Sequence, residues 1–184
     1  MKNIAVFLDR DGTINEEKNF ISKPEEVILI PKSANAIREL NKLGLKVFVI
    51  SNQSGIARGY FTEHDLHKIN ERLIRLLSEE NAYVDKIYYC PHLDEDNCNC
   101  RKPKPGMLLQ AENEFGIDLN NSFVVGDRFV DVDAGKNAGA KTVLVKTGYG
   151  EQSFNWGKEN NQFADFTAQN LYEGIQYIIK LLHG

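Results

Sequence analysis

Residues 4–13 read Ile-Ala-Val-Phe-Leu-Asp-Arg-Asp-Gly-Thr, an apolar run that ends abruptly in two carboxylates and a glycine. A short apolar run bounded by turn residues is typical of a strand buried on both faces, as in a parallel sheet. Asp9 and Asp11 come where this strand would end and the chain would turn. We therefore predict a parallel α/β sheet with polar chemistry at the carboxyl end of its first strand.

Similar apolar runs recur along the chain and alternate with longer amphipathic segments. We predict strands at residues 4–8, 46–50, 87–90, 122–125, 142–145 and 163–166. The predicted helices between them include one capped by Ser33 and stopped by Gly44, one capped by Thr62 together with Asp65, and helices at 106–115 and 171–182. Because strands alternate with helices, we predict a doubly wound, mostly parallel sheet with helices on both faces. The polar residues 148–162 are predicted to form a surface loop.

Composition limits the classes of protein that this chain can form. The 184 residues are a little over one average domain, so we predict a single domain over residues 1–184. With 42% hydrophobic residues, the chain can bury a core without disulfide bonds. Its net charge of -4 disfavours nucleic acid as a partner, and its apolar runs are too short to span a membrane. Because no secretory signal precedes residues 4–8, we expect a cytoplasmic protein, and we expect a monomer.

The carboxylates of Asp9 and Asp11 repel each other unless a cation or a shared proton relieves the repulsion. Mg²⁺ suits such a pair because it prefers oxygen ligands and keeps waters and substrate phosphates in its coordination shell. Asp and Gly are also common in solvated turns, so the pair alone fits an ordinary turn equally well. Asp127 and Asp131 follow the fourth predicted strand. Acidic groups repeated at one sheet edge favour a divalent-cation site.

Groups that can bind phosphate follow other predicted strands. Ser51, Asn52, Gln53 and Ser54 come after the second strand and can donate hydrogen bonds to phosphate oxygens, although such runs also form ordinary turns. Residues 101–106 read Arg-Lys-Pro-Lys-Pro-Gly and lead into a predicted helix. One of these lysines can neutralise an incoming phosphate, and the prolines limit the conformational freedom that is lost on binding.

The order of these groups resembles the four motifs of the haloacid dehalogenase (HAD) superfamily of phosphohydrolases: Asp9-x-Asp11-Gly-Thr, Ser51, Lys102 and Gly-Asp127-x-x-x-Asp131. The resemblance covers nearly the whole chain and implies a Rossmann-like core. It implies that Asp9 is the nucleophile, that Asp11 is the general acid and base, and that Ser51 and Lys102 bind the phosphate oxygens. It also implies that Mg²⁺ is held by Asp9, the backbone carbonyl of Asp11 and Asp127, with Asp131 coordinating directly or through water.

The three cysteines and a histidine gather within residues 90–100. Cys90, His92, Cys98 and Cys100 supply enough ligands for a closed tetrahedral Zn²⁺ site, which favours a structural role over a catalytic one. Isolated cysteines are often buried as small hydrophobic groups, but the segment between His92 and Cys98 is almost wholly polar. We therefore predict a zinc-bound loop.

The motifs Cys-x-His and Cys-x-Cys-Arg-Lys-Pro, which come directly before the third HAD motif, narrow the resemblance. They are similar to those of the D-glycero-D-manno-heptose 1,7-bisphosphate phosphatases, with the histidinol-phosphate phosphatases as close relatives that share the zinc loop. The first family implies hydrolysis of the C7 phosphate of a small phosphorylated sugar through an aspartyl-phosphate intermediate. Histidinol-phosphate hydrolysis is the alternative.

The intervals between the HAD motifs are mostly taken up by predicted core elements, so only a minimal cap is expected. Arg101 and Arg128 are then free to bind the rest of the substrate, and Arg101 can form a two-pronged contact with a distal phosphate. A flap after the first motif would line the entrance. The residues predicted to bind substrate are Glu17, Lys18, Asn19, Phe20, Asn52, Gln53, Ser54, Arg101 and Arg128.

Two other classes of protein fit part of this pattern. A phosphoacceptor signalling domain also gathers aspartates and Mg²⁺ at a parallel sheet edge, but it has no use for Asp11 as a proton donor. A zinc-organised binding module without activity would not depend on Asp9. Substitution of these two aspartates distinguishes both classes from a phosphatase.

Overall fold

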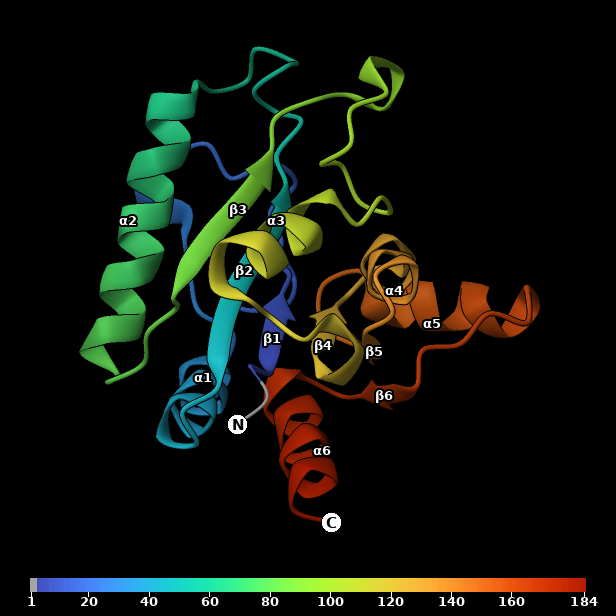
Figure 1. The fold of residues 1–184 in the computed structure, drawn as a ribbon. Helices are drawn as coiled ribbons and strands as arrows, with labels where there is room; N and C mark the ends of the chain where they lie inside the picture. The colour runs from blue at the N-terminus through green and yellow to red at the C-terminus, as the bar shows by residue number, and fades with distance from the viewer. Residues whose placement is uncertain (1–2) are drawn as a thin grey trace.

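The computed structural model describes residues 3–184, and its centre is a six-stranded sheet in the order β3-β2-β1-β4-β5-β6 (Figure 1). Each neighbouring pair of strands is parallel, as in the doubly wound folds. The strands are β1 Ala5–Leu8, β2 Lys46–Asn52, β3 Lys86–Cys90, β4 Phe123–Gly126, β5 Lys141–Val145 and β6 Phe166–Ala168. The predicted sheet is thus confirmed.

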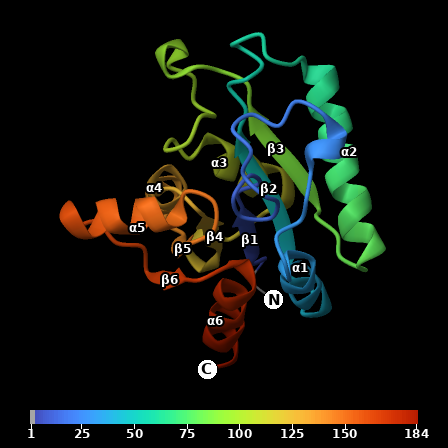
Figure 2. The same cartoon turned by 180° about the vertical axis from the view of Figure 1, so that it is seen from behind.

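Helices cover both faces of the sheet (Figures 1 and 2). The α-helices are α1 Ser33–Lys42, α2 Glu63–Glu79, α3 Gly106–Phe115, α4 Phe129–Asn137, α5 Gly150–Glu159 and α6 Leu171–His183. Three 3-10 turns, η1 Pro24–Glu26, η2 Asp94–Asp96 and η3 Leu119–Asn121, lie in the connections. Within the described residues, no helix is long and apolar enough to cross a membrane.

Alternate residues of β1 enter two different hydrophobic cores. Val6 and Leu8 pack in a core with α1, α2 and α6, whereas Ala5 and Phe7 pack with α3 and α4 on the opposite face. All four side chains are fully buried. Burial on both faces explains why the segment is continuously apolar instead of alternating. Because β1 ends at Leu8, the residues that follow lie at the carboxyl end of the central strands.

Three local predictions were wrong. Ser33 is the first residue of α1, and the cap position belongs to Lys32, which has a φ of 67°. The last strand begins at Phe166, where the predicted strand was to end. The predicted surface loop at 148–162 contains α5, because the packing of Trp156 against Phe129, with ring centroids 5.2 Å apart, stabilises a helix that its polar sequence does not indicate.

The capping box of α2 is confirmed. The Thr62 side chain accepts a hydrogen bond from the backbone N–H of Asp65, and the Asp65 carboxylate accepts one from the backbone N–H of Thr62. These contacts satisfy two donors that a helix start otherwise leaves unpaired. They fix the beginning of a long helix whose buried face lies against the sheet beside the first motif.

Candidate active site

Three buried carboxylates meet at the carboxyl edge of the sheet. Asp9 follows β1, Asp127 follows β4, and Asp131 lies in the first turn of α4. Each offers an oxygen within 4.8 Å of the other two. Burial, opposed by Lys102 and reinforced by Asp131, raises the pKa of Asp9 to about 7. Burial and the charges of Asp9 and Asp131 raise the pKa of Asp127 to about 9. The cluster is therefore short of positive charge.

Lys102 supplies the one ammonium group that directly contacts this cluster among residues 3–184. Its Nζ donates to Asp9 Oδ1 at 2.9 Å, to Asp131 Oδ1 at 2.6 Å and to the carbonyl of Ile50 at 2.8 Å. Burial alone would lower the pKa of Lys102, but Asp131 and Asp9 outweigh it and raise that pKa above its usual value. The ammonium group is therefore held in its charged form beside Asp9.

The side chain of Asn52, at the end of β2, holds the backbone of Lys102 in place. Asn52 Oδ1 accepts from the Lys102 N–H at 3.1 Å, and Asn52 Nδ2 donates to the Lys102 carbonyl at 3.1 Å. This two-way contact joins the loop that carries Lys102 to the central sheet. Asn52 was predicted to bind substrate. It lines the pocket, but its side-chain amide is hydrogen-bonded to the backbone of Lys102.

The carboxylate of Asp11 lies apart from the three-carboxylate cluster. It accepts two hydrogen bonds from Arg10, one from Asn15 Nδ2 at 2.9 Å and one from Gln53 Nε2 at 3.0 Å. Although burial raises it, the pKa of Asp11 is lowered overall by Arg10 and these donors. Gln53 Nε2 also donates to Ser51 Oγ at 2.7 Å, so one amide links the end of β2 to the first motif.

Asp127 has one buried oxygen that accepts no hydrogen bond, Oδ1. Its Oδ2 accepts from the backbone N–H of Tyr149 at 2.7 Å. Gly12 and Gly148 close around the same carboxylate, since a Cβ on either would lie 2.2 or 2.3 Å from Asp127 Oδ2. A buried oxygen without a donor, in a cluster of carboxylates, fits a cation such as Mg²⁺, which coordinates oxygen ligands.

A pocket opens above these groups and brings together most of the predicted substrate-binding residues. Its lining includes Asp9, Asp11, Ser51 and Lys102 together with Glu17, Asn19, Phe20, Asn52, Gln53, Ser54, Arg101 and Arg128. Lys18 instead lines a neighbouring groove with Ile30 and Pro31. Arg101 pairs with the carboxylate of Asp94 and donates to the carbonyl of His92, so this guanidinium is tied to the loop between β3 and α3.

Four residues of this pocket were not among the site residues predicted from the sequence: Asp94, Pro103, Val130 and Tyr149. The guanidinium of Arg128 lies 3.8 Å from the centre of the Tyr149 ring, a cation–π contact at the pocket wall. Tyr149 follows β5, so the rule that chemistry gathers at the carboxyl ends of strands could have indicated it. Asp94 follows β3 at the same distance along the chain, so the same rule could have indicated it.

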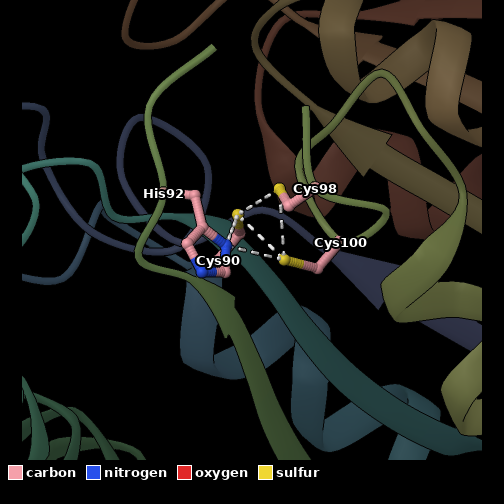
Figure 3. A group of neighbouring side chains, drawn as sticks. All are labelled: Cys90, His92, Cys98 and Cys100. Atoms are coloured by element: carbon pink, nitrogen blue, oxygen red, sulfur yellow. Dashed lines mark hydrogen bonds between the residues drawn. The ribbon is translucent and has the colours of Figure 1, made fainter. Parts of the chain in front are cut away.

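The four predicted zinc ligands meet in the loop between β3 and α3 (Figure 3). The three Sγ atoms lie 3.0–3.5 Å apart, and His92 Nδ1 lies 3.6 Å from Cys90 Sγ and 3.4 Å from Cys100 Sγ. Ligands of a tetrahedral Zn²⁺ at about 2.0–2.3 Å from the ion lie about 3.5–3.8 Å apart. Although burial raises it, donors led by the backbone N–H of Arg101 lower the pKa of Cys98 to about 6, which favours the thiolate. The donor set fits zinc, although the three sulfurs lie closer together than the ligands of a bound ion would.

Comparison with known proteins identifies the family. Residues 99–173 match the family model Hydrolase_like, described as "HAD-hyrolase-like". The chain is 46% identical over 151 residues to the D-glycero-beta-D-manno-heptose-1,7-bisphosphate 7-phosphatase of Pasteurella multocida. The match covers 78% of this chain and 82% of that protein. The chain belongs to the heptose-bisphosphate phosphatase family. The resemblance to the HAD superfamily is thus confirmed.

Solved structures of the heptose-bisphosphate phosphatase family share this fold. The crystal structure of D,D-heptose 1,7-bisphosphate phosphatase from B. bronchiseptica, complexed with magnesium and phosphate, has a TM-score of 0.91 and 33% identity, and the match covers 98% of this chain and 99% of that one. Another member, the D-glycero-alpha-D-manno-heptose-1,7-bisphosphate 7-phosphatase of Campylobacter jejuni, is 41% identical over 145 residues, or 79% of this chain and 83% of that protein. The family therefore includes enzymes named for either anomer.

Proposed function

We propose that this protein is a Mg²⁺-dependent phosphatase that removes the C7 phosphate of D-glycero-D-manno-heptose 1,7-bisphosphate through an aspartyl-phosphate intermediate. The observation that carries the proposal is the Asp9 carboxylate beside a buried, charged Lys102 at a sheet edge, in a chain of this phosphatase family. A carboxylate held against a fixed cation, inside a pocket of phosphate donors, suits attack on phosphorus.

The first step is an in-line displacement at phosphorus. A carboxylate oxygen of Asp9 forms a bond to phosphorus while the bond to the C7 oxygen of the sugar breaks. Lys102 and Ser51 stabilise the non-bridging oxygens, because charge redistributes onto them in the transition state. Gln53, whose amide contacts Ser51, orients that hydroxyl.

Asp11 exchanges the proton in both steps. Its protonated carboxyl gives a proton to the departing C7 oxygen, and its carboxylate then takes a proton from the water that attacks the aspartyl phosphate. The second step releases inorganic phosphate and restores Asp9. The contacts from Arg10 favour the carboxylate of Asp11, and the negative charge of a bound phosphate favours its protonated form, so substrate binding itself would promote the acid role.

Two metal ions fit the proposal. Asp9, Asp127 and the backbone carbonyl of Asp11 would hold Mg²⁺, with Asp131 beside them, since these residues supply the oxygen ligands that the ion prefers. Bound there, the ion would reduce the repulsion between a carboxylate nucleophile and a dianionic phosphate. Cys90, His92, Cys98 and Cys100 would hold a structural Zn²⁺, because four protein ligands leave no position for a reacting water.

The rest of the substrate would lie toward the outer part of the pocket. Arg101 and Arg128 line it and supply two cations suited to a distal phosphate. The flap residues Glu17, Asn19 and Phe20 line the same opening, and Lys18 stands beside it. We further propose that residues 1–184 act as one domain and as a monomer, because all proposed catalytic groups lie at one edge of the sheet of a single chain.

Substitution of Asp9 tests this proposal. We expect Asp9→Asn to lower phosphate release from the heptose bisphosphate at least about 10⁴-fold with the fold intact, because the nucleophile is lost. Asp133→Asn, a matched change on α4 outside the pocket, should retain near wild-type turnover. Steady-state release of inorganic phosphate measures both variants, and circular dichroism reports the fold.

A substrate panel separates the alternatives. Histidinol phosphate should be turned over far more slowly than the heptose bisphosphate, and comparable rates would favour the histidinol-phosphate phosphatase function. A phosphoacceptor domain would form a stable phosphoaspartate that survives in Asp11→Asn without release of phosphate. Turnover of Asp9→Asn near the wild-type rate would exclude the proposed mechanism, whereas unchanged function of Asp9→Asn in cells would favour a binding module.

A further inference from the structure

The first motif contains a buried arginine, Arg10, between the two aspartates of the pocket. The Arg10 residue is 1% exposed, and Nε and Nη2 donate to the two oxygens of Asp11 at 3.1 and 2.8 Å. A guanidinium is a planar fork that matches a carboxylate in this two-pronged way and fixes its plane. Arg10 itself is not part of the pocket lining, so its effect on chemistry would be exerted through Asp11.

The third nitrogen of this guanidinium, Nη1, is bound by a different part of the fold. Arg10 Nη1 donates to Asn70 Oδ1 at 3.1 Å, a contact between residues sixty positions apart. Asn70 lies on α2 and is 8% exposed. Its neighbours on the buried face of that helix are the apolar residues Leu66, Ile69, Leu73 and Leu77.

A polar residue in this position would weaken the apolar face of α2 if it had no partner. Its oxygen instead accepts a hydrogen bond from a buried guanidinium whose other two nitrogens donate to Asp11. Arg10 and Asp11 are adjacent in the chain, and the Asp11 side chain is 19% exposed toward the pocket. Asn15 and Gln53 also donate to the Asp11 carboxylate, whereas Asn70 anchors the guanidinium of Arg10. Loss of this anchor would let the guanidinium turn and would change the direction in which Asp11 presents its proton.

We propose that Asn70 is a positioning residue, which acts through Arg10 to fix the orientation of the Asp11 carboxyl for proton transfer to the leaving oxygen. The inference rests on the proposed role of Asp11 as general acid. In that step the bond between phosphorus and the leaving oxygen breaks, the leaving oxygen takes its electron pair and the Asp11 proton, and Asp9 holds the phosphoryl group.

Leaving-group dependence tests this inference, because an ester with a good leaving group needs little help from a general acid. We expect Asn70→Leu, which keeps similar size but removes the acceptor, to lower kcat/KM for the heptose bisphosphate about 10- to 100-fold. The same variant should hydrolyse 2,4-dinitrophenyl phosphate within about 2-fold of wild type. Asn70→Asp keeps an oxygen acceptor for Arg10 and should restore most of the loss.

Leu73→Ala is the matched control, since it loosens the same buried face of α2 and an apolar side chain cannot accept a hydrogen bond from Arg10. It should lower the thermal midpoint while leaving the ratio of the two substrates unchanged. If Asn70→Leu does not fold, Asn70→Ser carries the same expectation, because its shorter side chain does not reach Arg10. Equal losses for both esters, a changed ratio in Leu73→Ala, or no recovery in Asn70→Asp would each overturn the inference.

Asp11→Asn, measured in the same series, separates this inference from the proposed function. If Asp11→Asn loses activity selectively with the poor leaving group and Asn70→Leu does not, Asn70 has no positioning role while the proposed mechanism stands. If Asp11→Asn shows no selectivity, the acid role of Asp11 itself fails, and the inference about Asn70 fails with it.

Discussion

The carboxylate cluster and the zinc loop are organised in opposite ways, although both lie above the same edge of the sheet. The ion pair of Lys102 with Asp9 joins residues 93 positions apart, and the parallel pairing of β1 with β2 and β4 fixes the position of Asp9. The zinc ligands instead lie within residues 90–100, in a loop whose regular structure is one 3-10 turn. The first site is organised by the fold, whereas the second depends on its own ligands.

Lys102 connects the two regions, because it follows Cys100 by two residues and ends inside the carboxylate cluster. The less regular region thus supplies the proposed catalytic cation, and the more regular region supplies the carboxylates that bind it. Changes at Lys102, in the proposed zinc loop and in the carboxylate cluster should therefore have separable effects.

Replacement of Lys102 should have the largest effect on catalysis. We expect Lys102→Met to lower kcat/KM by at least about 10²–10³-fold, because the transition state loses a charged donor and the carboxylates of Asp9 and Asp131 lose their shared ammonium group. Lys104→Met, which removes a neighbouring lysine outside the cluster, is the control. A loss below about 5-fold in Lys102→Met would contradict the role of this ammonium group in the site.

Loss of one zinc ligand should have an intermediate effect confined to the loop. We expect Cys98→Ala to lose bound zinc and to lower kcat/KM about 10-fold, because the segment before Lys102 is then held less well. Amide hydrogen exchange should accelerate across residues 91–101 while β1 and β4 remain protected. Asn97→Ala, in the same loop, should keep one zinc per chain in metal analysis. Unchanged exchange in Cys98→Ala would show that the loop is organised without the metal.

The carboxylate cluster should produce the smallest effect, a pH-dependent change in thermal stability. Burial and neighbouring carboxylates raise the pKa of Asp127 to about 9, so the folded protein without Mg²⁺ binds this proton more tightly than the unfolded chain. The resulting stability is complete below the unfolded pKa of about 3.9 and is lost as pH rises toward 9. Mg²⁺ favours the carboxylate and offsets that loss.

The gain in thermal midpoint on addition of Mg²⁺ should therefore be a few degrees larger at pH 8 than at pH 6, which corresponds to a difference of about 1 kcal/mol in the free energy of unfolding. Differential scanning fluorimetry at the two pH values measures this difference. Asp127→Asn should remove most of it, whereas Asp118→Asn, which lies before β4 and so at the opposite end of that strand from Asp127, should not. An equal gain at both pH values would contradict the raised pKa of Asp127.

The sequence indicates the sheet and the cluster because both depend on short, local signals. Apolar runs mark strands that are buried on both faces, and parallel strands bring their carboxyl ends together, so Asp9 and Asp127 could be placed at one edge from the sequence alone. The helix at 106–115 was predicted with the bounds that the structure has. The four proposed zinc ligands could be predicted to gather from their clustering in a polar segment.

The remaining features depend on tertiary contacts that leave no local signal. The polar sequence of α5 does not predict a helix, which instead forms against the ring of Phe129. Asn70 resembles an ordinary polar interruption in an amphipathic helix until its contact with Arg10 is known. The side chain of Asn52 was predicted to bind substrate, because its hydrogen bonds to the backbone of Lys102, fifty positions away, leave no signal in the local sequence.

The two-way contact between Asn52 and the backbone of Lys102 also divides the β3–α3 loop into parts with different tolerance to change. The later part is fixed at Lys102 and again at Gly106, where an added Cβ would lie 2.1 Å from the carbonyl oxygen of Asn99. The earlier part, from Leu93 to Asn97, lies between the proposed zinc ligands His92 and Cys98 and is mostly exposed, and Asp94 is the residue of it that pairs with Arg101. Insertions and deletions should therefore accumulate there during evolution, since surface loops accept added length at little entropic cost and Lys102 would not move.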